Sequence, residues 1–279
     1  MVAVALGLAA GICWGVADFL GGVKSRQLSV VVVLVLSQAA GALVLGVIVA
    51  ARGQGPPELH FLVYGVLGGL AGLAGLAAFY RGLAVGAMAV VAPISATGAA
   101  IPVVVGLSTG DRPGPIQVVG LVLVLVGVVL ASREGGGGGA RARVAAGTGL
   151  ALVAAVGFGA FFVGLDAASD GDVLWALLAA RSFDVVLLVA LAVTLGGGTR
   201  LSPRDMRDVV AVGLFDVLAN SLFALASTQG LVSLVAVLAS LYPVVTILLA
   251  RSILKERIRA SQGVGVALAL AGVAGIASG

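Results

Sequence analysis

The chain has 279 residues, of which 61% are hydrophobic and only 10% charged, and its formal net charge is +4. Soluble domains of this size are about one quarter charged, so the composition excludes a soluble globular protein and indicates an integral membrane protein. The single cysteine, the single histidine and the lack of a basic cluster with interleaved aromatics argue against disulfides, metal centres and a nucleic-acid partner.

Apolar stretches separated by charged residues, glycine or proline predict ten transmembrane helices. A spanning helix needs about 20 apolar residues, and an isolated strand cannot satisfy its backbone in lipid. The first stretch is retained as a helix because it has no Lys or Arg before Trp14, so it lacks the charged start of a signal peptide. In chain order the predicted spans are residues 3–22, 29–51, 60–80, 87–108, 115–132, 145–165, 172–196, 206–228, 231–251 and 261–278.

The two halves of the chain resemble each other at a nearly constant offset. Gly15 and Gly159 each follow an aromatic residue and lie 144 positions apart, as do Gly86 and Gly230. An offset of 145 relates Asp111 to Glu256, Gln117 to Gln262, Gly120 to Gly265 and Gly127 to Gly272. Such agreement along the chain predicts two copies of one five-helix unit.

A low-complexity segment separates the two copies. Residues 133–143 contain five consecutive glycines, a composition typical of a flexible linker. The first repeat is therefore predicted at 1–132 and the second at 144–279. Because five helices are an odd number, the two repeats must be inverted in the membrane, an architecture of many secondary transporters.

Lys and Arg are distributed unequally between the two sides of this arrangement. Thirteen of the 16 lie in the loops after the odd-numbered spans, whereas only Arg52 and Arg112 lie on the other side. The positive-inside rule then predicts that the central linker is cytoplasmic and that both termini are outside.

Polar side chains within the apolar spans are candidates for function, because an ionised group there costs roughly 2.5–3.5 kcal/mol on insertion scales. Asp216 and Asn220 are four residues apart and share one helix face. Their equivalents in the first repeat are Gly72 and Leu76. The polar face is thus confined to one repeat, which favours a functional site over a structural hydrogen bond between helices.

The other polar candidates each have two interpretations. Arg181 and Asp184 are three residues apart, and Arg181 either responds to a substrate carboxylate or forms an internal salt bridge that Asp216 shares. Asp18 is either a proton-carrying carboxylate or an interfacial residue that caps its helix. Gln38 either lines a substrate path or hydrogen-bonds a neighbouring helix.

Aromatic and proline residues within the spans add further candidates. Trp14 lies away from the membrane interface where Trp is most common, and Tyr242 precedes Pro243; each either lines a cavity or fills a packing gap. Pro93, Pro102 and Pro243 lie within the fourth and ninth spans. Proline removes a backbone donor there and marks either a hinge or a tolerated kink.

Several short motifs are similar to those of EamA-type members of the drug/metabolite transporter superfamily. The first span carries Trp14-Gly15-x-x-Asp18-Phe19, and the ninth span and its exit carry Leu241-Tyr242-Pro243, Leu254-Lys255-Glu256-Arg257-Ile258 and Gln262-x-x-Gly265. Lys255 replaces the glycine that is usual in the family. The first repeat has Gly110-Asp111-Arg112-Pro113 at the equivalent place, where the motif is degraded.

This resemblance covers essentially the whole chain. It implies a ten-helix, inverted-repeat transporter in the cytoplasmic membrane, with a central cavity between the halves. The superfamily moves amino acids, metabolites, sugars and drugs, so the resemblance implies no particular substrate. It also implies cytoplasmic termini, in contrast to the distribution of Lys and Arg.

We therefore expect a secondary transporter or exporter of a small metabolite or drug-like molecule that works by alternating access. No phosphate-binding loop for ATP, cofactor motif or catalytic constellation is present in the sequence. A passive facilitator or channel of the same fold is the alternative. A membrane-embedded enzyme is a remote one, with Asp184 and Asp216 as its only plausible acid pair. The expected substrate path, in which a carboxylate would couple transport to protons, consists of Asp18, Gln38, Arg181, Asp184, Asp216, Asn220, Trp14 and Tyr242.

Overall fold

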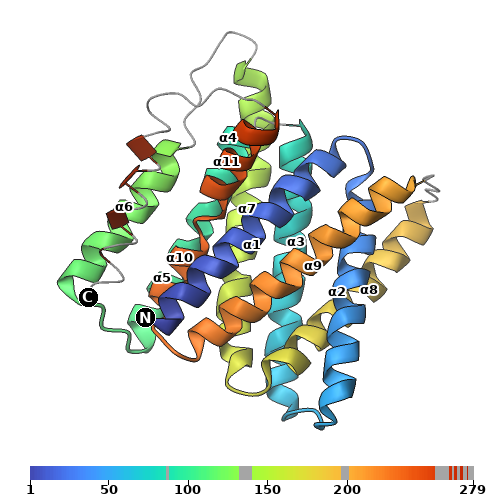
Figure 1. The fold of residues 1–279 in the computed structure, drawn as a ribbon, viewed down its shortest axis with the longest axis horizontal. Helices are drawn as coiled ribbons and strands as arrows, with labels where there is room; N and C mark the ends of the chain where they lie inside the picture. Colours follow the sequence, from blue (N-terminus) through green and yellow to red (C-terminus); the bar gives the residue numbers. More distant parts are fainter. Residues whose placement is uncertain are drawn as a thin grey trace.

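The computed structural model is a bundle of helices (Figure 1), with no strand among the residues that it describes. The described residues are 1–85, 88–131, 140–195 and 201–254, together with 264, 265, 267, 268, 271, 272 and 275. Gly86, the glycine run at 135–139, the motif residues Lys255 to Arg257 and most of the predicted span at 261–278 lie outside them. The all-helical prediction is confirmed for the described part of the chain.

In the described ranges, six helices are long and apolar enough to cross a membrane: α1 (Val2–Ser25), α2 (Val30–Arg52), α3 (Leu59–Val85), α7 (Ala140–Ser169), α8 (Val173–Leu195) and α9 (Pro203–Ser227). The shorter α6 (Pro115–Ala131) occupies the predicted fifth span. Because α7 begins at Ala140, the last four residues of the predicted 133–143 linker are helical.

The predicted fourth and ninth spans are divided helices, which corrects the expectation of one continuous helix in each. The fourth consists of α4 (Met88–Ala96), a 3-10 turn η1 (Thr97–Ala99) and α5 (Ala100–Thr109). The ninth consists of α10 (Val232–Ala239) and α11 (Tyr242–Leu254). Pro102 and Pro243 lie in the first turns of α5 and α11, where a missing backbone donor is tolerated. Both breaks therefore directly precede a helix that has proline in its first turn.

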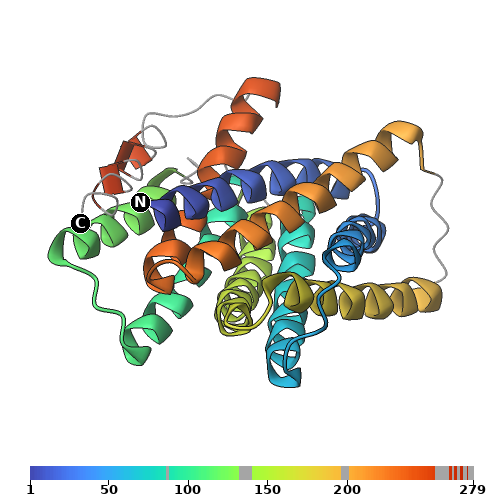
Figure 2. The same ribbon diagram turned by 60° about the horizontal axis from the view of Figure 1, so that its bottom comes forward.

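Helix packing repeats between the two halves. Helix α3 lies along α7, and their equivalents α9 and α1 lie along each other, while α2 packs against α8 (Figures 1 and 2). The glycines at 15 and 159 show the correspondence at atomic detail. A β-carbon at Gly15 would lie 2.5 Å from Val245 Cβ and 2.8 Å from the Tyr242 carbonyl oxygen, and one at Gly159 would lie 2.5 Å from Ile101 Cδ1 and 2.6 Å from the Gly98 carbonyl oxygen. Both sets of neighbours are 144 positions apart, like the glycines themselves.

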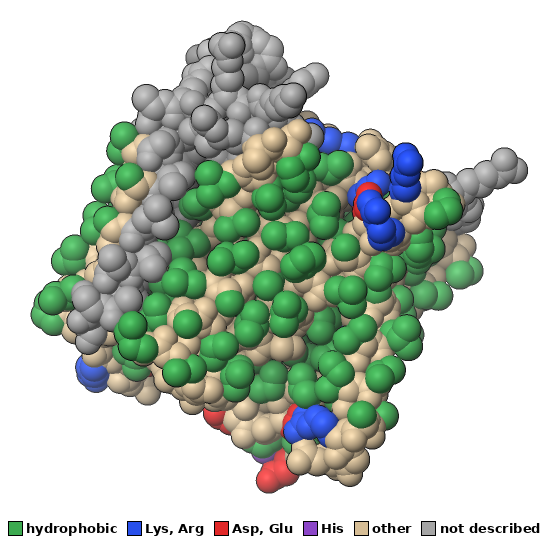
Figure 3. All heavy atoms as spheres, viewed as in Figure 1, with side chains coloured by type: hydrophobic (Ala, Val, Ile, Leu, Met, Phe, Trp, Pro, Cys, Tyr) green, Lys and Arg blue, Asp and Glu red, His purple; other side chains and the backbone are tan. Residues whose placement is uncertain are grey.

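Apolar side chains cover the face seen in Figure 3, and charged side chains gather at two opposite edges of it. At one end of the bundle, Lys24 of α1 contacts Asp205 and Asp208 of α9 at 2.8 and 3.0 Å. At another, Arg52 at the end of α2 contacts Asp172 at the start of α8 at 2.8 Å. An apolar belt between charged ends is the pattern of a multi-pass membrane protein.

Candidate substrate-binding site

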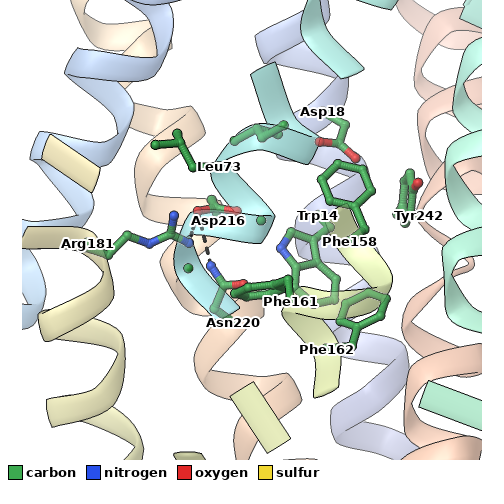
Figure 4. A pocket seen from close by; sticks show the side chains of 13 residues that line it. Trp14, Asp18, Leu73, Phe158, Phe161, Phe162, Arg181, Asp216, Asn220 and Tyr242 are labelled. Carbon is green, nitrogen blue, oxygen red and sulfur yellow. Dashed lines mark hydrogen bonds and ion pairs between the residues drawn. The ribbon is translucent and has the colours of Figure 1, made fainter. Parts of the chain in front are cut away.

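The central pocket lies between the two halves of the bundle and has a cavity volume of about 50 Å³ (Figure 4). Side chains from α1, α3, α7, α8, α9 and α11 form its wall. Apolar and small residues make up most of this wall, together with two carboxylates, one guanidinium and one amide. The lining residues are Trp14, Asp18, Gly69, Gly72, Leu73, Leu76, Phe158, Phe161, Phe162, Arg181, Asp216, Asn220 and Tyr242.

The polar part of the wall centres on the Arg181 guanidinium. Its Nη2 donates to Asp216 Oδ2 at 2.6 Å, and its Nη1 donates to Gln38 Oε1. The Asn220 side-chain amide donates to the same Asp216 oxygen at 3.2 Å. This network links α2, α8 and α9. The spacing of four residues places Asp216 and Asn220 on one helix face, as the sequence predicts.

Asp184 lies beside this network without completing it. The Asp184 side chain is 1% exposed, and its Oδ2 is 4.0 Å from Arg181 Nη1. Within the described part of the chain, neither Asp184 oxygen has a hydrogen-bond partner, and Arg181 Nε also lacks one. Arg181 therefore forms its close ion pair with Asp216, at 2.6 Å, and only a long contact with Asp184.

Asp18 enters the pocket from α1, where the sequence left open an interfacial capping role. The residue is only 6% exposed and lines the pocket. Figure 4 shows its carboxylate on a different part of the wall from the Arg181–Asp216 pair. No hydrogen bond or ion pair is formed by the Asp18 side chain with the other described residues. Its carboxylate is thus available to a molecule in the pocket.

Aromatic rings form the rest of the wall. The Trp14 ring lies 5.4 Å from Phe162 and 6.4 Å from Phe161, measured between centroids. Tyr242 packs edge-on to Phe158 at 6.4 Å, and its hydroxyl donates to the Ala92 carbonyl at 3.5 Å. Trp14 and Tyr242 thus line the pocket and also pack against neighbouring phenylalanine rings, so both interpretations left open by the sequence apply.

The structure brings all eight candidates of the sequence analysis to one region, but not all to the pocket surface. Gln38 and Asp184 lie behind the wall and contact Arg181. The other six line the pocket: Trp14, Asp18, Arg181, Asp216, Asn220 and Tyr242. Whether a substrate touches them remains a prediction.

The sequence analysis did not select the three phenylalanines of α7 as site residues. Phe158 and Phe162 nevertheless lie 144 positions after Trp14 and Asp18, so the repeat offset applied to the first-helix candidates would have found them. Phe161, equivalent to Ala17, carried no such signal. The glycine and leucine equivalents of Asp216 and Asn220, at 72 and 76, also line the pocket.

Comparison with known proteins assigns the family. The model of the EamA-like transporter family matches residues 1–133 and again residues 145–278. The chain belongs to the EamA-like transporter family. The match to both halves confirms the resemblance seen in the motifs, and it makes the protein a multi-pass membrane transporter of small molecules by family.

Solved structures share the fold of this EamA-like transporter. One crystal structure matches with a TM-score of 0.80 over 99% of this chain and 98% of its own, at 21% sequence identity. At that identity the match concerns the fold alone. A search of curated proteins gave no match.

Proposed function

We propose that the protein is a secondary transporter of a small organic molecule and that the central pocket is its substrate site. The observation that carries this proposal is the Arg181–Asp216 ion pair, 2.6 Å long, in the wall of a pocket lined by both halves. Ionisable residues within membrane spans mark substrate or ion pathways by default. Transport would proceed by alternating access, with one repeat rocking against the other around the pocket.

The proposed architecture has ten spans in two inverted repeats, 1–132 and 144–279, joined by the 133–143 linker. In this scheme α4, η1 and α5 together form the fourth span, α10 and α11 together form the ninth, and residues 261–278 form the tenth. The excess of Lys and Arg in the loops after the odd-numbered spans supports a protein in the cell membrane whose central linker faces the cytoplasm.

Proton coupling is the finer part of the proposal. Asp18 and Asp216 line the same pocket, and among the described residues only Asp216 has a cationic partner there. A proton on Asp18 would remove one negative charge from the pocket, and a bound substrate would change the net charge of the same pocket. Binding of the proton would therefore alter the affinity for the substrate, and binding of the substrate would alter the affinity for the proton.

Transport into liposomes tests the proposal. Purified protein is reconstituted into liposomes, and representatives of several metabolite classes are offered as substrates. For the transported class we expect saturable uptake, counterflow and stimulation by a pH gradient. Asp216→Asn should abolish uptake, and Asp18→Asn should remove the response to the pH gradient. Asp172→Asn, which changes an aspartate outside the pocket, is the matched control and should retain both.

The outcomes separate the alternatives. Flux without saturation or counterflow would indicate a passive facilitator of the same fold. A pH-gradient response that survives in both Asp18→Asn and Asp216→Asn would show that neither carboxylate couples protons to transport.

A further inference from the structure

The charges in and behind the pocket are unbalanced. Three aspartates, at 18, 184 and 216, share one described cation, Arg181. The side chains of Arg181, Asp184 and Asp216 are at most 15% exposed, and Asp18 is a buried residue. When the four groups are ionised, this region has two more negative than positive charges, and burial makes such an excess costly.

From this imbalance, and resting on the proposed function, we propose that the pocket binds an organic cation with an aromatic or apolar body. Asp216 receives its charged nitrogen, and Arg181 moves from Asp216 to Asp184 when the cation binds. The cation lowers the buried negative excess, whereas an anion would raise it. Asp18 offers a second carboxylate on the same wall.

The aromatic side of the pocket fits such a molecule. In Figure 4, Trp14, Phe158, Phe162 and Tyr242 are grouped on the side of the pocket away from Arg181. A cation near the face of an aromatic ring, best of all Trp, is attracted by the ring quadrupole, and more strongly where water is excluded. The same rings bury the apolar body, so both parts of an amphiphilic cation find a partner.

The second position for Arg181 is already present. Asp184 lies three residues further along α8, with Oδ2 at 4.0 Å from Arg181 Nη1. Both Asp184 oxygens and Arg181 Nε are buried and lack hydrogen-bond partners among the residues that the structure describes. Moving the guanidinium toward Asp184 would give these atoms partners and would leave Asp216 free, and it needs only side-chain rotation.

Asp184 does not line the pocket. It therefore acts as a positioning residue that holds Arg181 away from the bound cation. This role makes an unusual prediction: removing the positive charge of Arg181 should tighten the binding of a cation, because the internal competitor for Asp216 is lost. A residue with a purely structural role would not have this effect.

Four probes with one aromatic ring each test the substrate class: phenethylamine as cation, phenethyl alcohol as neutral molecule, phenylacetate as anion and phenylalanine as zwitterion. Binding to the purified full-length protein is measured by calorimetry and by Trp14 fluorescence, with Trp175→Phe removing the other tryptophan. We expect phenethylamine to bind at least about tenfold more tightly than each of the other probes, since removing one partner of a close charge pair commonly costs more than this.

The variants test the exchange of partners. Arg181→Gln should tighten phenethylamine binding, Asp184→Asn should weaken it severalfold, and Asp216→Asn should weaken it at least about tenfold. Asp172→Asn is the control outside the pocket and should leave it unchanged. If Arg181→Gln does not give folded protein, Asp184→Asn still decides, because it keeps the Arg181–Asp216 pair.

Several results would overturn the proposal. Tighter binding of phenylacetate, phenethyl alcohol or phenylalanine than of phenethylamine, or no binding of any probe, contradicts the substrate class. Weaker phenethylamine binding in Arg181→Gln, or unchanged binding in Asp184→Asn, contradicts the exchange. Saturable transport of a non-cation would leave the proposed function intact and reject only the cation, whereas cation binding without any transport would reject the proposed function.

Discussion

The two equivalent helices α3 and α9 line the pocket differently: α3 forms an apolar wall and α9 a polar one. Helix α3 contributes Gly72 and Leu76, whereas α9 contributes Asp216 and Asn220 at positions 144 later. Both helices reach the same pocket, so the repeated fold determines where the wall lies. The difference teaches that the shape of the pocket belongs to the shared unit, while its chemistry arises from substitutions in one copy.

Removing the Arg181–Asp216 ion pair from the polar wall should have the largest effect. Asp216→Ala leaves Arg181 without its close partner, and breaking a buried ion pair in this way costs about 3–5 kcal/mol of unfolding free energy. Adding Arg181→Ser, the equivalent of Ser37, removes the unpaired charge and should recover most of the loss. Denaturant unfolding in detergent micelles measures both.

The double variant is decisive for this comparison. It should be more stable than Asp216→Ala alone while remaining inactive in transport. If the double variant is no more stable than the single one, the ion pair is not the reason that Asp216 stabilises the protein.

Matched glycine substitutions should have intermediate and nearly equal effects. Gly15→Ala and Gly159→Ala both place a β-carbon against packed neighbours at 2.5 Å, and overpacking of this kind costs about 1–3 kcal/mol. Gly46→Ala is the control, since its nearest neighbour would be Leu178 Cδ1 at 3.9 Å. Thermal unfolding compares the three, and a loss confined to only one of the matched pair would show that the packing is not equivalent in the two halves.

The smallest effect should come from the Arg52–Asp172 pair, which lies outside the pocket. Burial alone would raise the pKa of Asp172, but hydrogen bonds from Arg52 and from two backbone amides outweigh it and lower the pKa. A lowered folded-state pKa gives stability above the unfolded pKa that is lost as the pH falls through the folded value. Solvent screening keeps this contribution small.

The measurement for this pair is the midpoint of thermal unfolding as a function of pH. Wild-type protein should lose a small increment of stability in the acidic range that Asp172→Asn has already lost at neutral pH. Equal pH dependence of the two proteins in that range would contradict the assigned role of the pair.

The sequence was sufficient to predict the membrane class, the repeat and the general position of most helices, because apolar run length and the repeat offset are local signals. The sequence did not predict the helix interruptions at Thr97–Ala99 and before Tyr242, because the apolar stretches continue through them. Pro102 and Pro243 indicated them, but a proline in a membrane span fits either a kink or a new helix.

The site was predictable to the extent that charge in an apolar span is conspicuous. Asp18, Arg181 and Asp216 were found for this reason. The depth of each side chain could not be predicted, because it depends on how three helices pack. Gln38 and Asp184, for example, lie behind Arg181 and not at the pocket surface. Among the rings of α7, the repeat offset indicates Phe158 and Phe162, whereas Phe161 carries no such signal because phenylalanine is common in any apolar helix.

The ion pairs of Lys24 with Asp205 and Asp208 should make one end of the bundle sensitive to ionic strength. Lys24, Asp205 and Asp208 hold the ends of α1 and α9 together, whereas the equivalent positions on α7 and α3 are Ala168, Phe61 and Tyr64. Separating the first pair of ends breaks ionic contacts that salt screens, and separating the second exposes apolar surface. Raising ionic strength should therefore ease opening at one end of the bundle but not at the other. In the proposed alternating-access cycle, salt concentration would then shift the balance between the two conformations.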